Sequence, residues 1–267
     1  MPFIVYSKTD PLSLNSAAFI RDEFGFEHIG TLNGFKHYRF ENIDMIEINS
    51  KLVETDFLDT TIDTDLIIFL SRHKSGADIK SFTVHSEGNW SGENKLGGRP
   101  RELSFAAPVE MAGILWRMNS LSHEGIDVVY EATHHGPYLK TPSLFAEFGG
   151  NDETLLEKAG SEAVAKAVMR FFADKKEGEI TFDKIAIGIG GMHYSKRFTK
   201  LALEGKYAFS HIMPKYFLQD YEMLEQAATR SNRAPEIAVM EWKSINREIR
   251  DRIIKKLNAI GMDYAKI

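Results

Sequence analysis

The chain has 267 residues, of which 43% are hydrophobic, and a formal net charge of −5 at pH 7. This length allows one large domain or two small ones with a substantial buried core. The absence of cysteine excludes disulfides, thiolate nucleophiles and thiolate-bound zinc, so a bound metal would need histidine and carboxylate ligands. The negative charge argues against non-specific nucleic-acid binding, which depends on neutralising many phosphates, so a polyanionic partner would need a local basic patch.

Targeting and membrane signals are missing from the sequence. No segment approaches the roughly 18 apolar residues of a membrane span, and the N-terminus lacks the basic start of a signal peptide. We therefore expect a cytoplasmic protein without membrane association and with no evident stable protein partner.

Strand-like and helical patterns alternate along the chain. The expected strands are residues 3–6, 35–40, 45–48, 65–70, 82–84, 126–130, 185–189, 208–213 and 235–242. The expected helices begin at Asn15 or Ser16, at Pro108 and at Ser161, and a long terminal helix covers residues 245–260. This alternation predicts a single α/β domain over residues 1–267 with long loops and a mainly parallel or mixed central sheet with helices on both faces.

Residues 88–101 contain four glycines and three cations and almost nothing apolar. This pattern predicts an exposed, mobile loop, whose length exceeds the usual connection and is typical of functional loops.

Six of the nine histidines lie at or just past the end of an expected strand: His73, His85, His134, His135, His193 and His211. The carboxyl ends of parallel strands line one edge of a sheet, where ligands bind, so we expect these side chains to converge. Histidine suits both proton transfer near neutral pH and zinc ligation. No short ligand spacing such as HExxH distinguishes the two roles, and a single histidine is often only a satisfied core residue.

Adjacent side chains on a strand point to opposite faces, so His134 and His135 reach one centre only if the backbone turns between them. The following Gly136-Pro137 pair predicts such a turn. Glu147 lies between apolar residues and is expected to point inward.

Seven short motifs resemble the archaeal and plant type of D-aminoacyl-tRNA deacylase: SRHKS (71–75), VHSEGNW (84–90), EATHHGP (131–137), FAEFGG (145–150), GIGGMHY (188–194), HIMPKY (211–216) and EWK (241–243). The resemblance implies a phosphorylase/hydrolase-like core and a proofreading enzyme that hydrolyses the ester between a D-amino acid and tRNA, releasing both. It also implies dependence on zinc. Matching family positions are His73, His85, His134, His135, Glu147, His193 and Lys215.

This reaction needs an activated water, an oxyanion site and contacts to phosphates. The candidate catalytic residues are His134, His193 and His85, with His134 or His193 activating water directly or through zinc. The candidate metal ligands are His73, His85, His134, His135, Glu147 and His193. The candidate substrate-binding residues are Lys95, Arg99, Arg101, Lys196, Arg197 and Lys215, with the Gly190 and Gly191 N–H groups for the oxyanion. No serine lies in a GxSxG motif, which argues against an acyl-serine intermediate.

Other classes of protein fit the same residues. A peptidyl-tRNA hydrolase-like, nucleoside-phosphorylase-like or metallopeptidase-like enzyme would use similar histidines on a different substrate. A non-catalytic RNA-binding module would not need the histidines at all. Preference for N-acetylated aminoacyl-tRNA, turnover of free nucleosides or peptides, or binding without hydrolysis would identify these alternatives.

Overall fold

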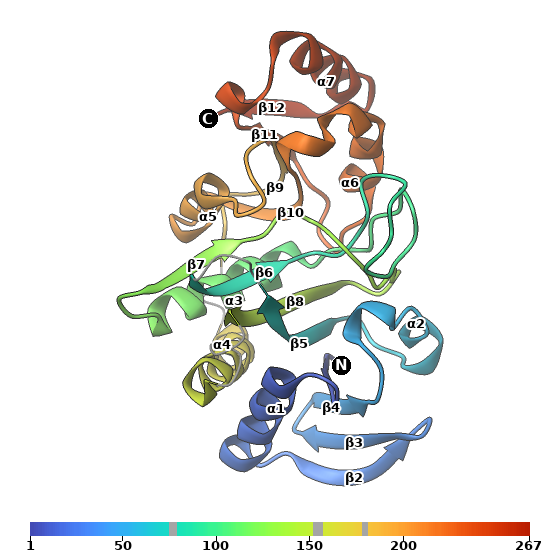
Figure 1. Ribbon diagram of the computed structural model, residues 1–267, viewed down its shortest axis with the longest axis vertical. Coiled ribbons are helices and arrows are strands. Elements are labelled where there is room, and N and C mark those ends of the chain that lie inside the picture. The colour runs from blue at the N-terminus through green and yellow to red at the C-terminus, as the bar shows by residue number, and fades with distance from the viewer. Residues whose placement is uncertain (75–78, 152–156, 178–180) are drawn as a thin grey trace.

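The computed structural model describes the chain except for residues 75–78, 152–156 and 178–180 (Figure 1). The strands are β1 (Phe3–Ser7), β2 (Glu27–Leu32), β3 (Phe35–Phe40), β4 (Ile43–Ile48), β5 (Ile67–Lys74), β6 (Lys80–His85), β7 (Ile126–Tyr130), β8 (Ser143–Gly150), β9 (Lys184–Ile189), β10 (Tyr207–Met213), β11 (Ile237–Met240) and β12 (Asp263–Lys266). The α-helices are α1 (Pro11–Phe24), α2 (Leu58–Thr61), α3 (Pro108–Leu121), α4 (Lys158–Glu177), α5 (Lys196–Leu203), α6 (Leu224–Thr229) and α7 (Arg247–Ala259). None of these helices is long and apolar enough to cross a membrane.

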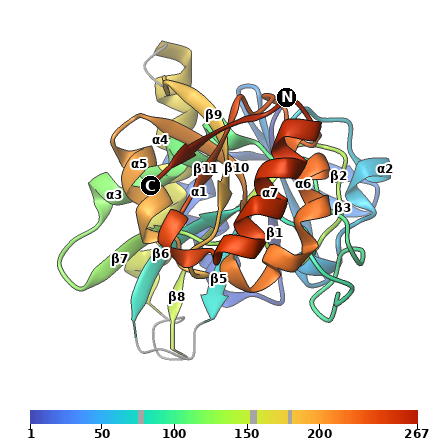
Figure 2. The same cartoon turned by 90° about the horizontal axis from the view of Figure 1, so that it is seen from above.

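The described strands form two sheets instead of one. Eight strands in the order β2-β3-β4-β1-β5-β8-β6-β7 form a mixed sheet, and four parallel strands in the order β10-β9-β11-β12 form a second. The second sheet, with α5, α6 and α7, lies at one end of the molecule and β2 and β3 lie at the other (Figure 1); Figure 2 shows the molecule from above, with α7 in front. The predicted α/β class with a mixed central sheet is confirmed.

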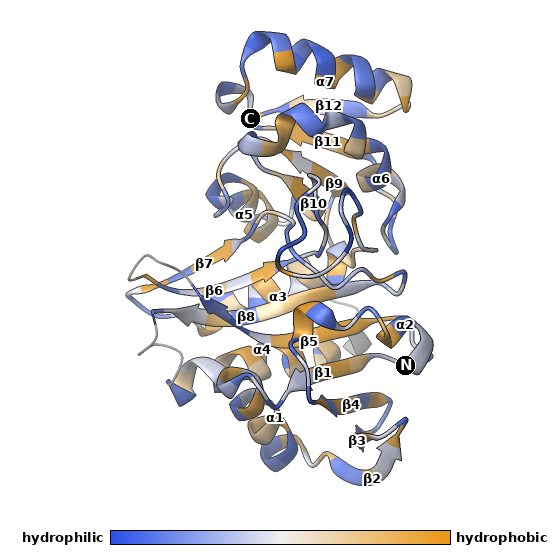
Figure 3. Cartoon of the chain, turned by 45° about the vertical axis from the view of Figure 1, so that its right-hand side comes forward, coloured by the Kyte–Doolittle hydropathy of each residue, from blue (hydrophilic) through white to orange (hydrophobic). Residues whose placement is uncertain are grey.

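The large sheet buries both of its faces, as the continuous apolar runs of β1 and β5 predict. On one face Ile4, Ile68 and Phe148 pack in the same core as α1, α3 and α4. On the other face Val5 and Phe69 pack with Leu58 of α2. Hydrophobic residues accordingly dominate β1 and β5, whereas α7 alternates between hydrophobic and hydrophilic residues (Figure 3).

Several element boundaries differ from the prediction. The first helix begins at Pro11 because the Asp10 carboxylate accepts hydrogen bonds from the Leu12 and Ser13 N–H groups, so the predicted caps Asn15 and Ser16 are wrong. Strand β5 continues to Lys74, which places His73 inside the strand. The sequence analysis did not identify β2 and β12, both short and rich in exposed residues.

The loop of residues 88–101 is less exposed than predicted. Trp90 is only 1% exposed, and its indole Nε1 donates a hydrogen bond to the Thr133 carbonyl at 3.0 Å. Gly136 N–H donates to the Leu96 carbonyl at 3.0 Å. The loop is therefore packed against the segment that carries the two adjacent histidines.

Candidate active site

One face of the large sheet provides half of the site. Glu147 on β8 lies directly between Ser71 on β5 and Thr83 on β6, and residues opposite one another on neighbouring strands share a face. His73 and His85 lie two residues farther along and point to that same face. The Glu147 Oε2 atom is 3.6 Å from His73 Nδ1 and 3.9 Å from His85 Nε2. The inward orientation of Glu147 is confirmed.

The strand arrangement that brings His73 and His85 together differs from the prediction. Strand β5 is parallel to β8, but β6 is antiparallel to it, so β5 and β6 run in opposite directions. Their carboxyl ends therefore cannot line one edge of the sheet, and that prediction is wrong for this pair. His73 and His85 meet because they share a face across β8.

The segment after β7 provides the other half of the site and joins the two sheets. Ala132 N–H donates to the His193 carbonyl at 2.8 Å, and Thr133 N–H donates to the Ile212 carbonyl at 3.0 Å. The backbone then turns, with His135 in the left-handed region at φ 44°. Both the His134 and the His135 rings consequently approach His85, at centroid distances of 4.2 and 4.8 Å. The predicted turn between the two histidines is confirmed.

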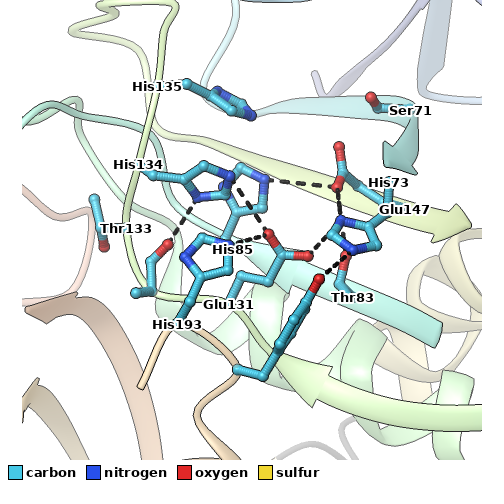
Figure 4. A network of polar contacts seen from close by, with 12 residues as sticks. Ser71, His73, Thr83, His85, Glu131, Thr133, His134, His135, Glu147 and His193 are labelled. Atoms are coloured by element: carbon cyan, nitrogen blue, oxygen red, sulfur yellow. Dashed lines mark hydrogen bonds and ion pairs between the residues drawn. The ribbon is translucent and has the colours of Figure 1, made fainter. Parts of the chain in front are cut away.

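Glu131 is the centre of the polar network (Figure 4). Its carboxylate is fully buried, with Oε1 2.8 Å from His73 Nδ1 and Oε2 3.0 Å from His193 Nε2 and 3.4 Å from His134 Nε2. Burial by itself would raise the Glu131 pKa, but hydrogen bonds from His193 and His73 outweigh it and lower the pKa well below the usual value. The sequence analysis missed this residue, although an acidic residue directly after a buried strand was a usable signal.

His73 carries the compensating positive charge. Burial would lower its pKa, but hydrogen bonds and charges from Glu131 and Glu147 raise the pKa to about 11. Its Nε2 atom is 2.7 Å from the Tyr194 hydroxyl, which accepts a hydrogen bond from the imidazolium. Burial, and then repulsion from Glu131, raises the pKa of Glu147. The His73 imidazolium thus balances part of the negative charge of the two buried carboxylates.

Three other histidines present free ring nitrogens to one point. The Nδ1 atoms of His85, His134 and His135 lie 3.2, 2.8 and 2.6 Å from backbone carbonyls, to which they donate, so each Nε2 keeps its lone pair. The ligand atoms lie within 4.8 Å of one another, and within the described chain the buried His85 Nε2 has no hydrogen-bond partner. Burial lowers the pKa of His85 to about 3 and that of His135 to about 4, which keeps both neutral. Neutral imidazoles oriented by backbone carbonyls are typical zinc ligands.

A cavity of about 520 Å³ opens onto this network. Five of the predicted site residues line it: His73, His134, His135, Glu147 and His193. His85 lies behind them and is 1% exposed. We call this space the main cavity.

His211 does not join the other five histidines. Its Nε2 donates to the Ser104 carbonyl at 3.0 Å, and its ring meets the edge of Trp90. The predicted convergence is therefore confirmed for five histidines and wrong for His211, because β10 belongs to the second sheet and directs this side chain into the core.

The predicted oxyanion groups are already occupied. Gly190 N–H donates to the Met213 carbonyl at 2.8 Å, and Gly191 N–H donates to Ser244 Oγ at 2.8 Å. Neither N–H is free to stabilise an oxyanion, so this part of the prediction is wrong. A Cβ atom at Gly190 would lie 2.5 Å from Ser244 Oγ, which shows that the glycine allows close packing of its own chain instead of a ligand.

Most of the predicted phosphate-binding cations have partners within the protein. Lys95 pairs with Glu93, Arg99 with Asp56, Arg101 with Asp220, Lys196 with Asp127 and Arg197 with Glu241. Lys215 is exposed, and within the described chain no carboxylate lies within ion-pair distance of it. Exposed ion pairs are weak enough to open for a phosphate, so all six cations stay candidates.

A family model and two similar proteins carry the same functional name, and a similar crystal structure carries none. A family model described as D-aminoacyl-tRNA deacylase matches residues 60–265. The D-aminoacyl-tRNA deacylase of Pyrococcus furiosus is 35% identical over 275 residues, with all of both chains covered, and that of Ignicoccus hospitalis is 39% identical over 262 residues, with 97% of each covered. A crystal structure of a conserved protein of unknown function, AF0625, superposes with a TM-score of 0.90 at 28% identity and covers all of this chain and 95% of the other.

Proposed function

This chain belongs to the D-aminoacyl-tRNA deacylase family and is a hydrolase of the ester between a D-amino acid and tRNA; we propose that the network around Glu131 in the main cavity performs this hydrolysis. The observation that carries the proposal is that four histidines and two buried carboxylates line a single cavity, with His85 buried directly behind them. Water, an ester carbonyl and an aminoacyl group fit into this volume.

We assign the general base to His193. Its side chain is 32% exposed, so water can reach it, and Glu131 holds its Nε2–H at 3.0 Å. That hydrogen bond leaves the lone pair on Nδ1, which is 3.2 Å from the Tyr216 hydroxyl. A carboxylate that orients a histidine in this way is a recurring arrangement in hydrolases. His193 Nδ1 takes a proton from the attacking water and returns it to the ribose oxygen of the tRNA as the ester bond breaks.

The aminoacyl group occupies the main cavity next to Glu131 and Glu147. The α-ammonium of an aminoacyl ester is cationic, and these two carboxylates line the cavity. His73 neutralises part of their charge, which favours one small cation over a strongly basic peptide.

A zinc ion fits the Nε2 atoms of His85, His134 and His135. Three convergent neutral imidazoles form a donor set that suits zinc, and the buried Nε2 of His85 has no hydrogen-bond partner among the described residues. Bound there, zinc would supply Lewis-acid polarisation of the ester carbonyl. In this arrangement His85 acts by holding the metal, and Glu147 and His73 support the site as an ion pair.

The main test compares enantiomers. We expect the purified protein to hydrolyse D-Tyr-tRNA far faster than L-Tyr-tRNA, and His134→Ala to abolish turnover while uncharged tRNA still binds, because phosphate contacts are made elsewhere. His123→Ala, an exposed histidine outside the cavity, is the matched control and should keep wild-type activity. Equal rates on both enantiomers, or preference for N-acetyl-Tyr-tRNA, would reject the deacylase assignment; unchanged turnover in His134→Ala would reject the proposed site.

Metal content provides a second test. We expect about one zinc per chain in the purified wild type by elemental analysis, and its loss in His135→Ala. His73→Gln should keep the metal, because His73 is paired with Glu131 and Tyr194. Full activity of exhaustively chelated, metal-free protein would remove zinc from the mechanism.

A further inference from the structure

A second cavity of about 390 Å³ adjoins the two adjacent histidines. It shares His134, His135 and Leu96 with the main cavity and is otherwise lined by different residues. The histidine pair is therefore a wall common to both cavities. A molecule whose reacting bond lies at this wall can place one half on each side.

The two cavities have different linings. Several charged side chains line the main cavity, including Asp10, Arg72 and Glu147. The second cavity is lined by Trp90, Leu96 and Phe217, together with the exposed Lys95. The Trp90 Nε1–H is already bonded to the Thr133 carbonyl, so this side chain offers only its apolar surface.

Two features mark the apolar lining as a binding surface. Leu96 is 62% exposed, although it lies between the two cavities. Phe217 is half-buried and packs against the exposed Tyr216, with ring centroids 4.8 Å apart, and Tyr216 in turn reaches His193. An exposed leucine and paired aromatic rings beside a catalytic histidine provide a surface on which a flat ring can stack.

On the basis of the proposed function, the substrate has two chemically different halves. The ester joins a small cationic aminoacyl group to a nucleoside, which has a flat base and an anionic phosphate. The base matches the apolar lining, because nucleobases in single-stranded ends bind by stacking on aromatic and apolar side chains. The ammonium matches the carboxylates of the main cavity. Among the described residues that line the second cavity, Glu93 is the only one with a carboxylate, and this carboxylate is already paired with Lys95.

We propose that the second cavity binds the terminal nucleoside of the tRNA, with its base against Phe217 and Leu96 and its phosphate near Lys95. The cavity volume is within the range of small-ligand sites. This placement puts the ester at His134 and His135 and directs the aminoacyl group into the main cavity. Binding of the nucleoside thus positions the ester, and this binding does not depend on which amino acid is attached.

The test uses adenosine 5′-monophosphate as a probe that lacks the ester. By isothermal titration calorimetry we expect the wild type to bind this nucleotide and Phe217→Leu to bind it roughly 5- to 100-fold more weakly, the usual effect of losing one stacked ring. Phe217→Leu keeps apolar volume for packing, and Leu96→Ala, at an exposed position, repeats the test without risk to folding. Ile29→Ala, an exposed apolar residue on β2, is the matched control and should bind like the wild type.

Kinetics separate this inference from the proposed function. With D-Tyr-tRNA, Phe217→Leu and Leu96→Ala should raise KM and change kcat less than about twofold. No nucleotide binding by the wild type at millimolar concentration, or equal affinity in wild type and Phe217→Leu, would overturn the inference even if hydrolysis proceeds. Nucleotide binding that Phe217→Leu weakens, without any hydrolysis of D-Tyr-tRNA by the wild type, would support this cavity and overturn the deacylase mechanism.

Discussion

Glu131 shows how one residue organises the site. Its two oxygens lie 2.8 to 3.4 Å from three histidines that come from three separate segments, and its burial strengthens the hydrogen bonds that His73 and His193 donate to it. The EATHHGP motif contains Glu131 next to two histidines, and the sequence pattern alone favoured the histidines as the functional residues. Which member of a motif is central depends on the partners that the fold brings to it.

At the residue scale, His211 provides a prediction about pH. Burial, reinforced by the positive charge of Arg230, lowers its pKa to about 4 from a usual value of 6.5. The unfolded chain therefore binds a proton between these values that the folded chain does not, so the contribution of His211 to stability is complete above pH 6.5 and is lost as the pH falls towards 4. This shift corresponds to about 3 kcal/mol at most.

We expect His211→Gln, whose amide can still donate to the Ser104 carbonyl, to flatten this acid-dependent loss. The measurement is the free energy of unfolding in urea at several pH values from 7.5 to about 4.5, with a chelator present. Turnover of D-Tyr-tRNA at pH 7.5 should be nearly unchanged, because His211 does not line the main cavity. Parallel pH profiles for variant and wild type would contradict the assignment of a shifted His211.

At the element scale, the pairing of β5 with β8 holds His73 and Glu147 in place. Gly149 lies opposite His73 on the neighbouring strand, and a Cβ atom there would lie 1.8 Å from the His73 carbonyl oxygen. This oxygen is a backbone atom, so it cannot move away without a shift of strand β5. A glycine at this position is required by the close approach of the two strands.

Gly149→Ala should therefore displace β5 and lower both stability and activity. We expect a loss of about 1–3 kcal/mol in the free energy of unfolding, typical of overpacking, and a larger fractional loss of kcat on D-Tyr-tRNA. Gly92→Ala is the matched control, because its Cβ would meet nothing within 4 Å. Wild-type stability and activity in Gly149→Ala would show that the strands tolerate the added atom.

At the scale of the whole molecule, electrostatics constrain how tRNA binds. The net charge of −5 opposes a polyanion, so affinity depends on local cations near the cavities. Lys215 follows β10 at the start of a 3-10 helix (Lys215–Met223) and is exposed. Since no carboxylate in the described part of the chain lies within ion-pair distance of Lys215, this cation can contact a phosphate without first breaking such an ion pair.

We expect Lys215→Gln to weaken binding of uncharged tRNA and to reduce the slope of log K against log salt by about 0.7–0.9, the value for one phosphate contact. Binding measured by fluorescence anisotropy between about 50 and 200 mM salt tests this. Lys36→Gln on β3, a cation that does not line either cavity, should leave the slope unchanged. An unchanged slope in Lys215→Gln would exclude a phosphate contact at this residue.

The sequence by itself determined the α/β class, most of the element types and five of the histidines at the site. These features follow from local information: a short apolar run such as that within residues 65–70 favours a buried strand, and the Gly136-Pro137 pair favours a turn.

The tertiary structure alone decided how these parts meet. The antiparallel placement of β6 beside β8, the division of the strands into two sheets, the exclusion of His211 and the central position of Glu131 all depend on contacts between residues far apart in the chain. The Gly190 and Gly191 N–H groups illustrate the same limit, because only the folded chain brings Met213 and Ser244 to accept their hydrogen bonds. Local patterns specify which groups a segment carries, but long-range pairing determines which of those groups stay available for chemistry.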